Sequence, residues 1–286
     1  MPANTSEKYE TFTLDVTDAI AHLRFCRPDK ANSMTPAFWR ELPAAIKDIS
    51  DKGEARVIVL SAEGKHFSSG MDISVFMENG ALFADDSPRE VVAERFRHSV
   101  KELQDTFSAL ENARQPVLAA IQGGAVGAGV DLVTACDCRY ATRDAFFSVH
   151  ETAIGMTADV GTFPRLAKLI PEGIARQMSY TAERLPADRA KAAGLVNEVY
   201  DDADEMLAAV METARQIAQH SPLAVTGVKR MITYSRDHTT DDTLDYVAVW
   251  NAGMLSIRDI QETYTAKAEK RSPDYPALQS LKHKGA

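Results

Sequence analysis

The first two hundred residues contain several short runs of apolar residues whose spacing is typical of β-strands. Residues 11–25 alternate apolar and polar side chains on both sides of a turn at Thr17 and Asp18, which predicts a β-hairpin. Runs at 56–61, with β-branched and apolar residues at its centre, and at 116–121 predict strands that are buried on both faces of a sheet. Shorter strands are predicted at 137–141, 146–150 and 195–200.

Helical patterns separate these strands. Thr35 and Pro36 have the features of a helix start and Gly53 those of a helix end, so a helix is predicted between them. A long helix is predicted from Pro88 to about Arg114. Residues 74–87 have a mixed pattern and are predicted to be irregular. Further helices are predicted at 129–135, from 164 onward and at 186–194.

From Ala203 onward the pattern is helical throughout, with helices predicted at 204–219, 222–236 and 240–269. Repeated strand–strand–helix units followed by a helical tail predict an α/β body with an α-helical appendage. We therefore divide the chain into an α/β core at residues 1–205, which holds the candidate site, and a C-terminal helical region at 206–286.

Composition narrows the class of protein. The chain has 286 residues, 45% of them hydrophobic, and a net charge of −9, so it can bury a large core but lacks the basic surface of a nucleic-acid binder. Three cysteines are typical of a reducing compartment rather than of a disulfide framework. Residues 1–10 have no targeting pattern, residues 282–286 form no peroxisomal address, and no apolar run is long enough for a membrane span. These features predict a soluble cytoplasmic protein that binds neither nucleic acid nor membrane.

Three carboxylates lie near glycine-bearing turns and are the candidate catalytic residues. Asp131 ends the glycine-rich loop that begins at Gln122, Glu151 follows a predicted strand, and Asp159 lies two residues before Gly161. Carboxylates beside free backbone N–H groups suit proton transfer next to a carbonyl. Taken singly, each acid also has a structural interpretation: a helix-start residue, a surface residue or a turn cap.

Two loops of small residues could supply the N–H groups. Residues 68–71 and 126–129 each follow a predicted buried strand, and two such loops that converge would form an oxyanion hole. The alternative is that their glycines only permit tight turns. His150 and Glu151 lack the second histidine of a zinc-protease helix, and the glycine loop matches neither a P-loop nor a dinucleotide fingerprint. The sequence therefore predicts no metal and no cofactor.

Several segments resemble a known superfamily. Residues 116–137, 65–73 and 27–32 resemble the motifs of the crotonase, or enoyl-CoA hydratase/isomerase, superfamily, and the likeness covers roughly residues 10–275. It implies a crotonase-like fold of repeated ββα units, a C-terminal helical trimerisation region, a homotrimer or dimer of trimers, and an acyl-CoA substrate whose coenzyme A is not a separate cofactor. Within the superfamily, the branch that isomerises 3,5-dienoyl-CoA is most similar, at 129–137, 144–147, 158–162 and 234–238.

By position, the resemblance puts the oxyanion donors on the N–H groups of Met71 and Ala128. The superfamily usually has glycine where this chain has Ala128, so the N–H is kept and a methyl group is added. The residues that the resemblance implies for substrate binding are Lys30, Ala31, Gly70, Met71, Asp72, Ile73, Ser74, Val75 and Gly129.

Asp159 distinguishes two reactions. Hydratases of the superfamily hold one water with glutamates at the positions of Asp131 and Glu151, and typically have glycine where this chain has Asp159. The resemblance instead implies an isomerase of β-oxidation that converts 3,5-dienoyl-CoA to 2,4-dienoyl-CoA. In it Glu151 removes a proton from C2, Asp159 delivers one to C6 and Asp131 orients its partners. The alternatives are an enoyl-CoA hydratase and a non-catalytic acyl-CoA binding protein.

Overall fold

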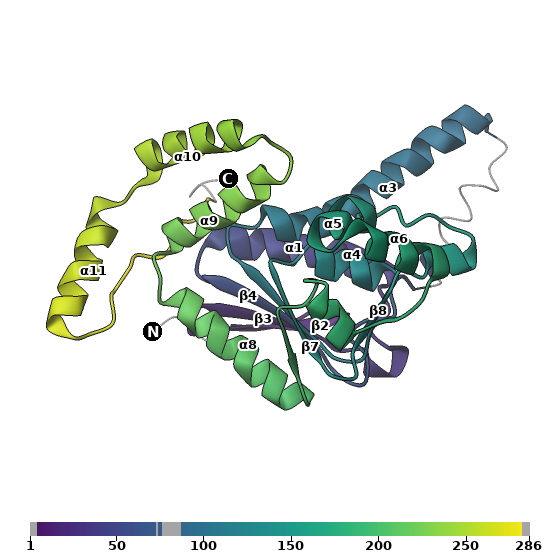
Figure 1. Ribbon diagram of the computed structural model, residues 1–286, viewed down its shortest axis with the longest axis horizontal. Coiled ribbons are helices and arrows are strands. Elements are labelled where there is room, and N and C mark those ends of the chain that lie inside the picture. The colour runs from purple at the N-terminus through teal and green to yellow at the C-terminus, as the bar shows by residue number, and fades with distance from the viewer. Residues whose placement is uncertain (1–4, 73, 76–86, 282–286) are drawn as a thin grey trace.

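The computed structural model describes residues 5–72, 74–75 and 87–281. Its body is a β-sheet with helices on both faces, and a helical arm reaches away from one end of that body (Figure 1). The predicted irregular segment 74–87 lies outside the described residues, apart from 74, 75 and 87.

The main sheet has seven strands, in the order β1-β2-β3-β4-β5-β7-β10. The first three strands pair antiparallel and the others parallel. The predicted hairpin is confirmed, with its turn at Asp18 and Ala19, which both adopt positive φ. The strands are β1 (Thr5–Lys8), β2 (Phe12–Thr17), β3 (Ile20–Phe25), β4 (Val57–Ala62), β5 (Val117–Ile121), β7 (Cys138–Thr142) and β10 (Glu198–Tyr200).

A second sheet of three strands crosses the region of the glycine-rich loop. It consists of β6 (Gly124–Val126), β8 (Phe146–Ser148) and β9 (Leu185–Pro186). The sequence predicted only a glycine-rich loop from Gln122 to the helix at 129, but β6 pairs in parallel with β8, and Ser68 bridges Ala125. These contacts fix the glycine-rich loop between two other segments of the chain.

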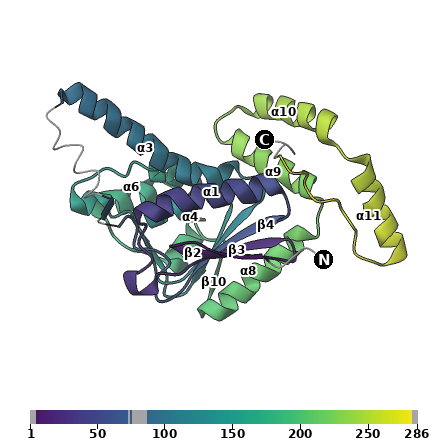
Figure 2. The same cartoon turned by 180° about the vertical axis from the view of Figure 1, so that it is seen from behind.

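Helices cover both faces of the main sheet. Helices α1, α3 and α4 lie on one face and α8 lies on the other, as the two opposite views show (Figure 1, Figure 2). The predicted helices after Thr35 and Pro88 are confirmed. The helices of the body are α1 (Pro36–Lys52), α3 (Arg89–Asn112), α4 (Ala128–Thr134), α5 (Thr162–Leu169), α6 (Glu172–Thr181), α7 (Ala187–Ala192) and α8 (Ala203–Ala218), with 3₁₀ turns η1 (Pro28–Lys30) and η2 (Glu151–Ile154).

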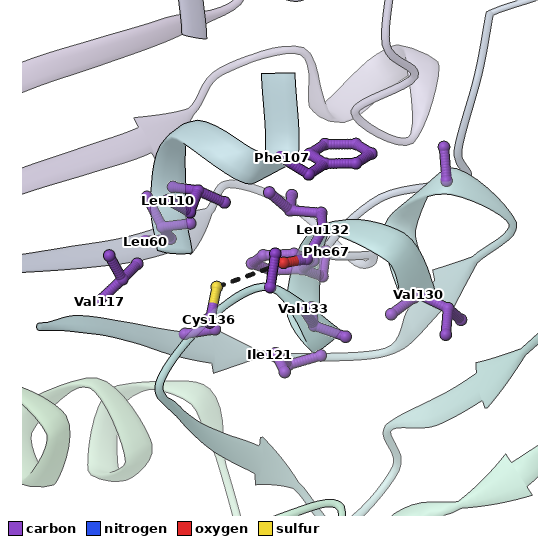
Figure 3. Close-up of a cluster of buried hydrophobic side chains, with 14 of the residues drawn as sticks. Leu60, Phe67, Phe107, Leu110, Val117, Ile121, Val130, Leu132, Val133 and Cys136 are labelled. Atoms are coloured by element: carbon purple, nitrogen blue, oxygen red, sulfur yellow. Dashed lines mark hydrogen bonds between the residues drawn. The ribbon is translucent and has the colours of Figure 1, made fainter. Parts of the chain in front are cut away.

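Strand β4 shows why the continuous apolar runs form central strands. Its side chains alternate between faces, so Ile58 and Leu60 join the core under α1, α3 and α4, whereas Val57 and Val59 pack with α8. On the first face, Leu60 lies among Phe107 and Leu110 of α3 and residues of α4 (Figure 3). Cys136 is buried in the same cluster, where its thiol donates to the carbonyl of Leu132.

The C-terminal arm consists of α9 (Pro222–Ser235), α10 (Thr240–Met254) and α11 (Ile257–Glu269). The single helix predicted at 240–269 is wrong, because the chain breaks at Leu255 and Ser256. The Ser256 hydroxyl accepts from the N–H of Asp259 and so starts a new helix. Among the described residues, no helix is long and apolar enough to cross a membrane.

Candidate active site

Asp131 lies in the first turn of α4 and is fully buried. Its Oδ1 accepts a hydrogen bond of 2.5 Å from the N–H of Thr162, the first residue of α5. Its Oδ2 is buried and has no hydrogen-bond partner among the described residues. Burial, reinforced by the negative charge of Glu151, raises the pKa of Asp131 to about 7. A proton can therefore reside on this group near neutral pH.

Glu151 begins the 3₁₀ turn that follows β8 and lies directly over the glycine-rich loop. A β-carbon at Gly127 would lie 3.3 Å from Glu151 Oε1. Within the described part of the chain, Glu151 Oε2 is buried without a hydrogen-bond partner. Burial raises the pKa of Glu151, and the charge of Asp159 adds to the effect. An incompletely solvated carboxylate of this kind is a stronger base than an exposed one.

Asp159 lies in the segment between η2 and α5 and is half-buried. Burial raises its pKa, and its backbone carbonyl accepts a hydrogen bond of 2.6 Å from Gln104 of α3. The negative charge of Glu151 helps to raise the pKa of Asp131, and that of Asp159 helps to raise the pKa of Glu151. The fold thus brings the three predicted acids into one site, with Glu151 linked to both of the others.

The two loops of small residues are in contact at this site. Ser68 accepts from the N–H of Val126, and a β-carbon at Gly70 would lie 2.6 Å from the carbonyl oxygen of Val126 and 3.2 Å from the nitrogen of Ala128. Gly70 therefore permits an approach that no side chain would allow. No acceptor in the described ranges takes up the N–H of Met71 or of Ala128. These two donors are available for a ligand oxygen, as an oxyanion hole requires.

The predicted substrate-binding residues lie on two segments that contact each other. Ala31 accepts a hydrogen bond from the N–H of Ser69, and the Ser33 hydroxyl donates to Asp72 over 2.6 Å. That bond is the main reason why the pKa of Asp72 falls to about 2, so this carboxylate is charged and fixed. Asp72 also accepts from Ser74, while Lys30 is exposed.

The remaining predicted substrate-binding residues divide into three cases. Val75 is buried and its N–H donates to the carbonyl of Asp72. Gly129 lies in the first turn of α4, where a β-carbon would be 3.1 Å from the carbonyl of Ser68. Ile73 lies outside the described residues.

Sequence reasoning missed the residues that hold the acids in place. Thr162 contributes through its backbone N–H, which carries no sequence signal. Gln104, which binds the Asp159 carbonyl, lies 55 residues away on α3. The one available sign was a polar stripe at helical spacing, formed by Lys101, Gln104, Ser108 and Glu111, but such a stripe usually indicates only a solvated helix face.

Fold and site together define a class of protein. The chain belongs to the enoyl-CoA hydratase/isomerase family, whose sequence model matches residues 15–277. It is 42% identical, over 93% of its own length and 82% of the relative's, to a mouse (Mus musculus) protein named Delta(3,5)-Delta(2,4)-dienoyl-CoA isomerase, mitochondrial. It is 36% identical, over 96% of its length and 100% of the relative's, to the peroxisomal dienoyl-CoA isomerase of Arabidopsis thaliana.

Solved structures confirm the predicted crotonase-like α/β fold. The enoyl-CoA hydratase from Bacillus anthracis matches with a TM-score of 0.82 at 29% identity, covering 96% of this chain and all of that one. An enoyl-CoA hydratase from Polaromonas sp. JS666 matches with a TM-score of 0.81 at 25% identity, covering 93% of this chain and 99% of that one. The predicted family is thereby confirmed as well.

The predicted cytoplasmic location is contradicted by the same comparison. The mouse relative is named mitochondrial and the Arabidopsis relative peroxisomal. The prediction depended on the composition of residues 1–10 and 282–286. Receptors read the compartment from targeting segments, which are independent of the chemistry of the folded core. The lack of a familiar targeting pattern in two short stretches was therefore a weak basis for the prediction.

Proposed function

We propose that this protein is a dienoyl-CoA isomerase of fatty acid β-oxidation, which converts 3,5-dienoyl-CoA to 2,4-dienoyl-CoA. The observation that carries the proposal is a third carboxylate, Asp159, electrostatically coupled to Glu151, in addition to Asp131. A double-bond shift over this distance needs one group to take a proton and a second group to give one. The names of the mouse and Arabidopsis relatives support the same reaction.

In the proposed mechanism, Glu151 removes a proton from C2 of the thioester. The electron pair of the broken C–H bond moves into a dienolate, whose oxygen accepts hydrogen bonds from the N–H groups of Met71 and Ala128. Each such donor typically contributes about 3–4 kcal/mol to transition-state stabilisation. The negative charge is shared along the conjugated chain as far as C6. Asp159, in its protonated form, then donates its proton to C6.

The protonation states fit this cycle. Glu151 ends neutral and Asp159 ends charged, so one proton must return from Glu151 to Asp159 before the next turnover. The raised pKa values of all three acids favour a site that keeps a proton at neutral pH. In this scheme Asp131 orients its partners.

The acyl-CoA thioester is the only small molecule that this chemistry uses, and coenzyme A enters as part of the substrate. We assign its binding to the segments 30–31, 70–75 and 129. We also propose that the C-terminal helical region, residues 206–286, forms the contacts of a homotrimer or dimer of trimers. The support is a set of exposed apolar side chains on α9–α11: Val228, Ile232, Leu244, Val249, Met254, Leu255, Ile257, Ile260 and Tyr264.

The proposal is tested by incubating the protein with 3,5-octadienoyl-CoA and following the absorbance of the conjugated 2,4-diene. Glu151→Gln and Asp159→Asn should each lower kcat by about 10²–10⁴-fold, because each removes one proton-transfer group. Asp105→Asn, on the exposed side of α3, serves as the control and should leave kcat unchanged. Folded wild-type protein that gives no diene at micromolar concentration would reject the isomerase.

One observation favours a second candidate, an enoyl-CoA hydratase. Asp131 Oδ2 and Glu151 Oε2 are both buried and lack partners among the described residues, so the pair could hold a water. For a hydratase, Asp159→Asn should leave the hydration of crotonyl-CoA unchanged. For the isomerase, that variant should lose diene formation while it still binds the CoA ester. Binding without any turnover in the wild type would indicate a non-catalytic acyl-CoA binding protein.

A further inference from the structure

The turn at residues 159–162 carries two of the functional groups, and a guanidinium group packs against its centre. Asp159 begins the turn, and the N–H of Thr162, which binds Asp131, ends it. Between them Gly161 has φ +135°, and a β-carbon there would lie 1.8 Å from Nη1 of Arg165. Arg165 therefore occupies the space that a side chain at Gly161 would need, so the turn and the guanidinium are fitted to each other.

Arg165 is in turn held by the polar stripe of α3. Its Nε and Nη2 donate to Glu111 Oε2 over 2.8 and 2.7 Å, and its Nη2 also donates to Ser108 over 3.2 Å. The Arg165 side chain is only 11% exposed and that of Glu111 only 19%. Charge-assisted bonds that are this well shielded from solvent are strong and directional. From the same stripe, Gln104 binds the carbonyl of Asp159.

These contacts connect Asp159, and the N–H group that binds Asp131, to the polar side chains of α3. We propose that Arg165, anchored by Glu111, is a positioning residue that sets the place of Asp159 and of the Thr162 N–H relative to Glu151. This inference rests on the proposed function, since Asp159 needs accurate placement only if it donates to C6. The positive charge of Arg165 also acts on Asp131, whose pKa it lowers. Removal of the Arg165 guanidinium should therefore displace Asp159 and the Thr162 N–H and should raise the pKa of Asp131.

Glu111 offers an internal control for a merely structural role. Its other oxygen, Oε1, accepts from Arg236, the residue that follows α9, over 2.8 Å. Arg236 thus makes a comparably shielded ion pair with the same carboxylate, at 24% side-chain exposure. Within the described ranges, Arg236 makes no hydrogen bond to the backbone of residues 159–162. If Glu111 only stabilises the packing of the helices, removal of Arg165 and removal of Arg236 should change kcat to a similar extent.

The experiment compares Arg165→Gln with Arg236→Gln. We expect Arg165→Gln to lower kcat for 3,5-octadienoyl-CoA by about 10–100-fold with KM changed less than about threefold, because misplaced groups lose rate rather than binding. Arg236→Gln should stay within about twofold of wild type in both constants. Arg165→Lys keeps the positive charge but loses the planar guanidinium group. Its kcat should therefore lie between those of Arg165→Gln and the wild type.

A second readout does not depend on turnover. The carboxyl carbon of Asp131 can be followed by NMR in protein labelled at aspartate, with Asp131→Asn for assignment. Removal of a nearby positive charge raises the titration midpoint of a carboxyl group. We therefore expect a higher midpoint in Arg165→Gln, and the wild-type midpoint in Arg165→Lys and Arg236→Gln.

The outcomes separate the two proposals. Equal losses of kcat in Arg165→Gln and Arg236→Gln, or wild-type kcat and midpoint in Arg165→Gln, would overturn the positioning role. If Arg165→Gln does not fold, Glu111→Gln replaces it, because it frees Arg165 without removing its charge and should still lower kcat. If wild-type protein forms no diene, the proposed isomerase fails, and the Asp131 titration then decides on Arg165 alone.

Discussion

Asp131 and Thr162 lie 31 residues apart in the chain, and a single hydrogen bond from the Thr162 N–H to the buried Asp131 carboxylate joins them. Since Thr162 begins α5, the bond places the carboxylate at the positive end of that helix. The other carboxylate oxygen has no partner among the described residues. One hydrogen bond and a helix end therefore offset only part of the desolvation of this charge, and the pKa of Asp131 stays high.

This relationship predicts a stability that decreases as pH rises. An aspartate with an ordinary pKa of 3.8 in the unfolded chain has a pKa of about 7 in the folded protein. Between these values the folded state binds more protons than the unfolded state, so the free energy of unfolding should fall with increasing pH. The total contribution is at most about 4 kcal/mol.

The variant Asp131→Asn should reduce this decrease, because the amide carries no charge at any pH. Urea unfolding followed by circular dichroism at pH 4.5 and pH 8 provides the measurement. We expect the variant to have a higher urea midpoint than wild type at pH 8 and a similar midpoint at pH 4.5. Asp105→Asn should follow the wild type at both values. If the urea midpoint changed equally between pH 4.5 and pH 8 in the wild type and in Asp131→Asn, the burial of Asp131 would not explain the pH dependence.

A methyl group at position 127 should disturb catalysis more than folding. Gly127 has φ 54° and ψ −122°, which disfavours other residues, and an added β-carbon would be 3.3 Å from Glu151 Oε1. Gly127→Ala should cost about 1–3 kcal/mol of stability and should also displace the Glu151 carboxylate and lower kcat. Gly155→Ala is the matched control, because φ is +80° there but nothing lies within 4 Å of an added β-carbon. Similar kcat values for the two variants would show that backbone strain alone matters.

The N–H of Ala128 can be removed with little change to the helix. Ala128 is the first residue of α4, a position where proline keeps the helical φ and removes only an N–H without an intrahelical partner. Ala128→Pro should lower kcat by about 10²–10³-fold if this group stabilises the dienolate oxygen. Ala128→Gly keeps the donor and should remain within a few-fold of wild type. Steady-state kinetics would detect the difference, and equal activity of the two variants would remove Ala128 from the oxyanion hole.

Much of the fold is readable from the sequence because local and tertiary preferences agree. The run at 56–61 is apolar at its four central positions, and the structure places Ile58 and Val59 in cores on opposite faces of the sheet. The predicted end of α1 at Gly53 is confirmed by its left-handed conformation. In both cases a few adjacent residues determine the outcome. The predicted acids also come together, although their roles remain predictions.

Other features depend on partners that are distant in the chain. Strand β6 contains only Gly124, Ala125 and Val126, and it forms because β8 lies beside it. Gly253 lies next to the end of α10 at Met254, but a single glycine is tolerated within a helical pattern, so the pattern at 240–269 predicts one unbroken helix. The bond from Arg165 to Glu111 spans 54 residues and joins two polar side chains of ordinary surface type. No local pattern predicts such a contact.

One buried lysine helps to attach the C-terminal arm to the core, in addition to the pair between Arg236 and Glu111. Lys229 of α9 is 7% exposed, and its ammonium group donates to the carbonyls of Leu110 and Gln115 over 2.7 and 2.9 Å. The same group lies 2.9 Å from Asp137, whose carboxylate also accepts from the N–H of Val117. Lys229→Met should therefore leave two carbonyl oxygens and one carboxylate without their partner, at a cost of about 3–5 kcal/mol.

Thermal and urea unfolding would measure this loss, with Lys191→Met as the control. Lys191 also forms an ion pair, with Glu198, but both side chains are nearly half exposed, so its removal should change stability by less than about 1 kcal/mol. Because the partners of Lys229 described above do not include the three acids, its variant should keep the wild-type KM at temperatures where it is folded. An equal, small effect of the two substitutions would mean that the apolar packing of α9, and not this ion pair, holds the arm to the core.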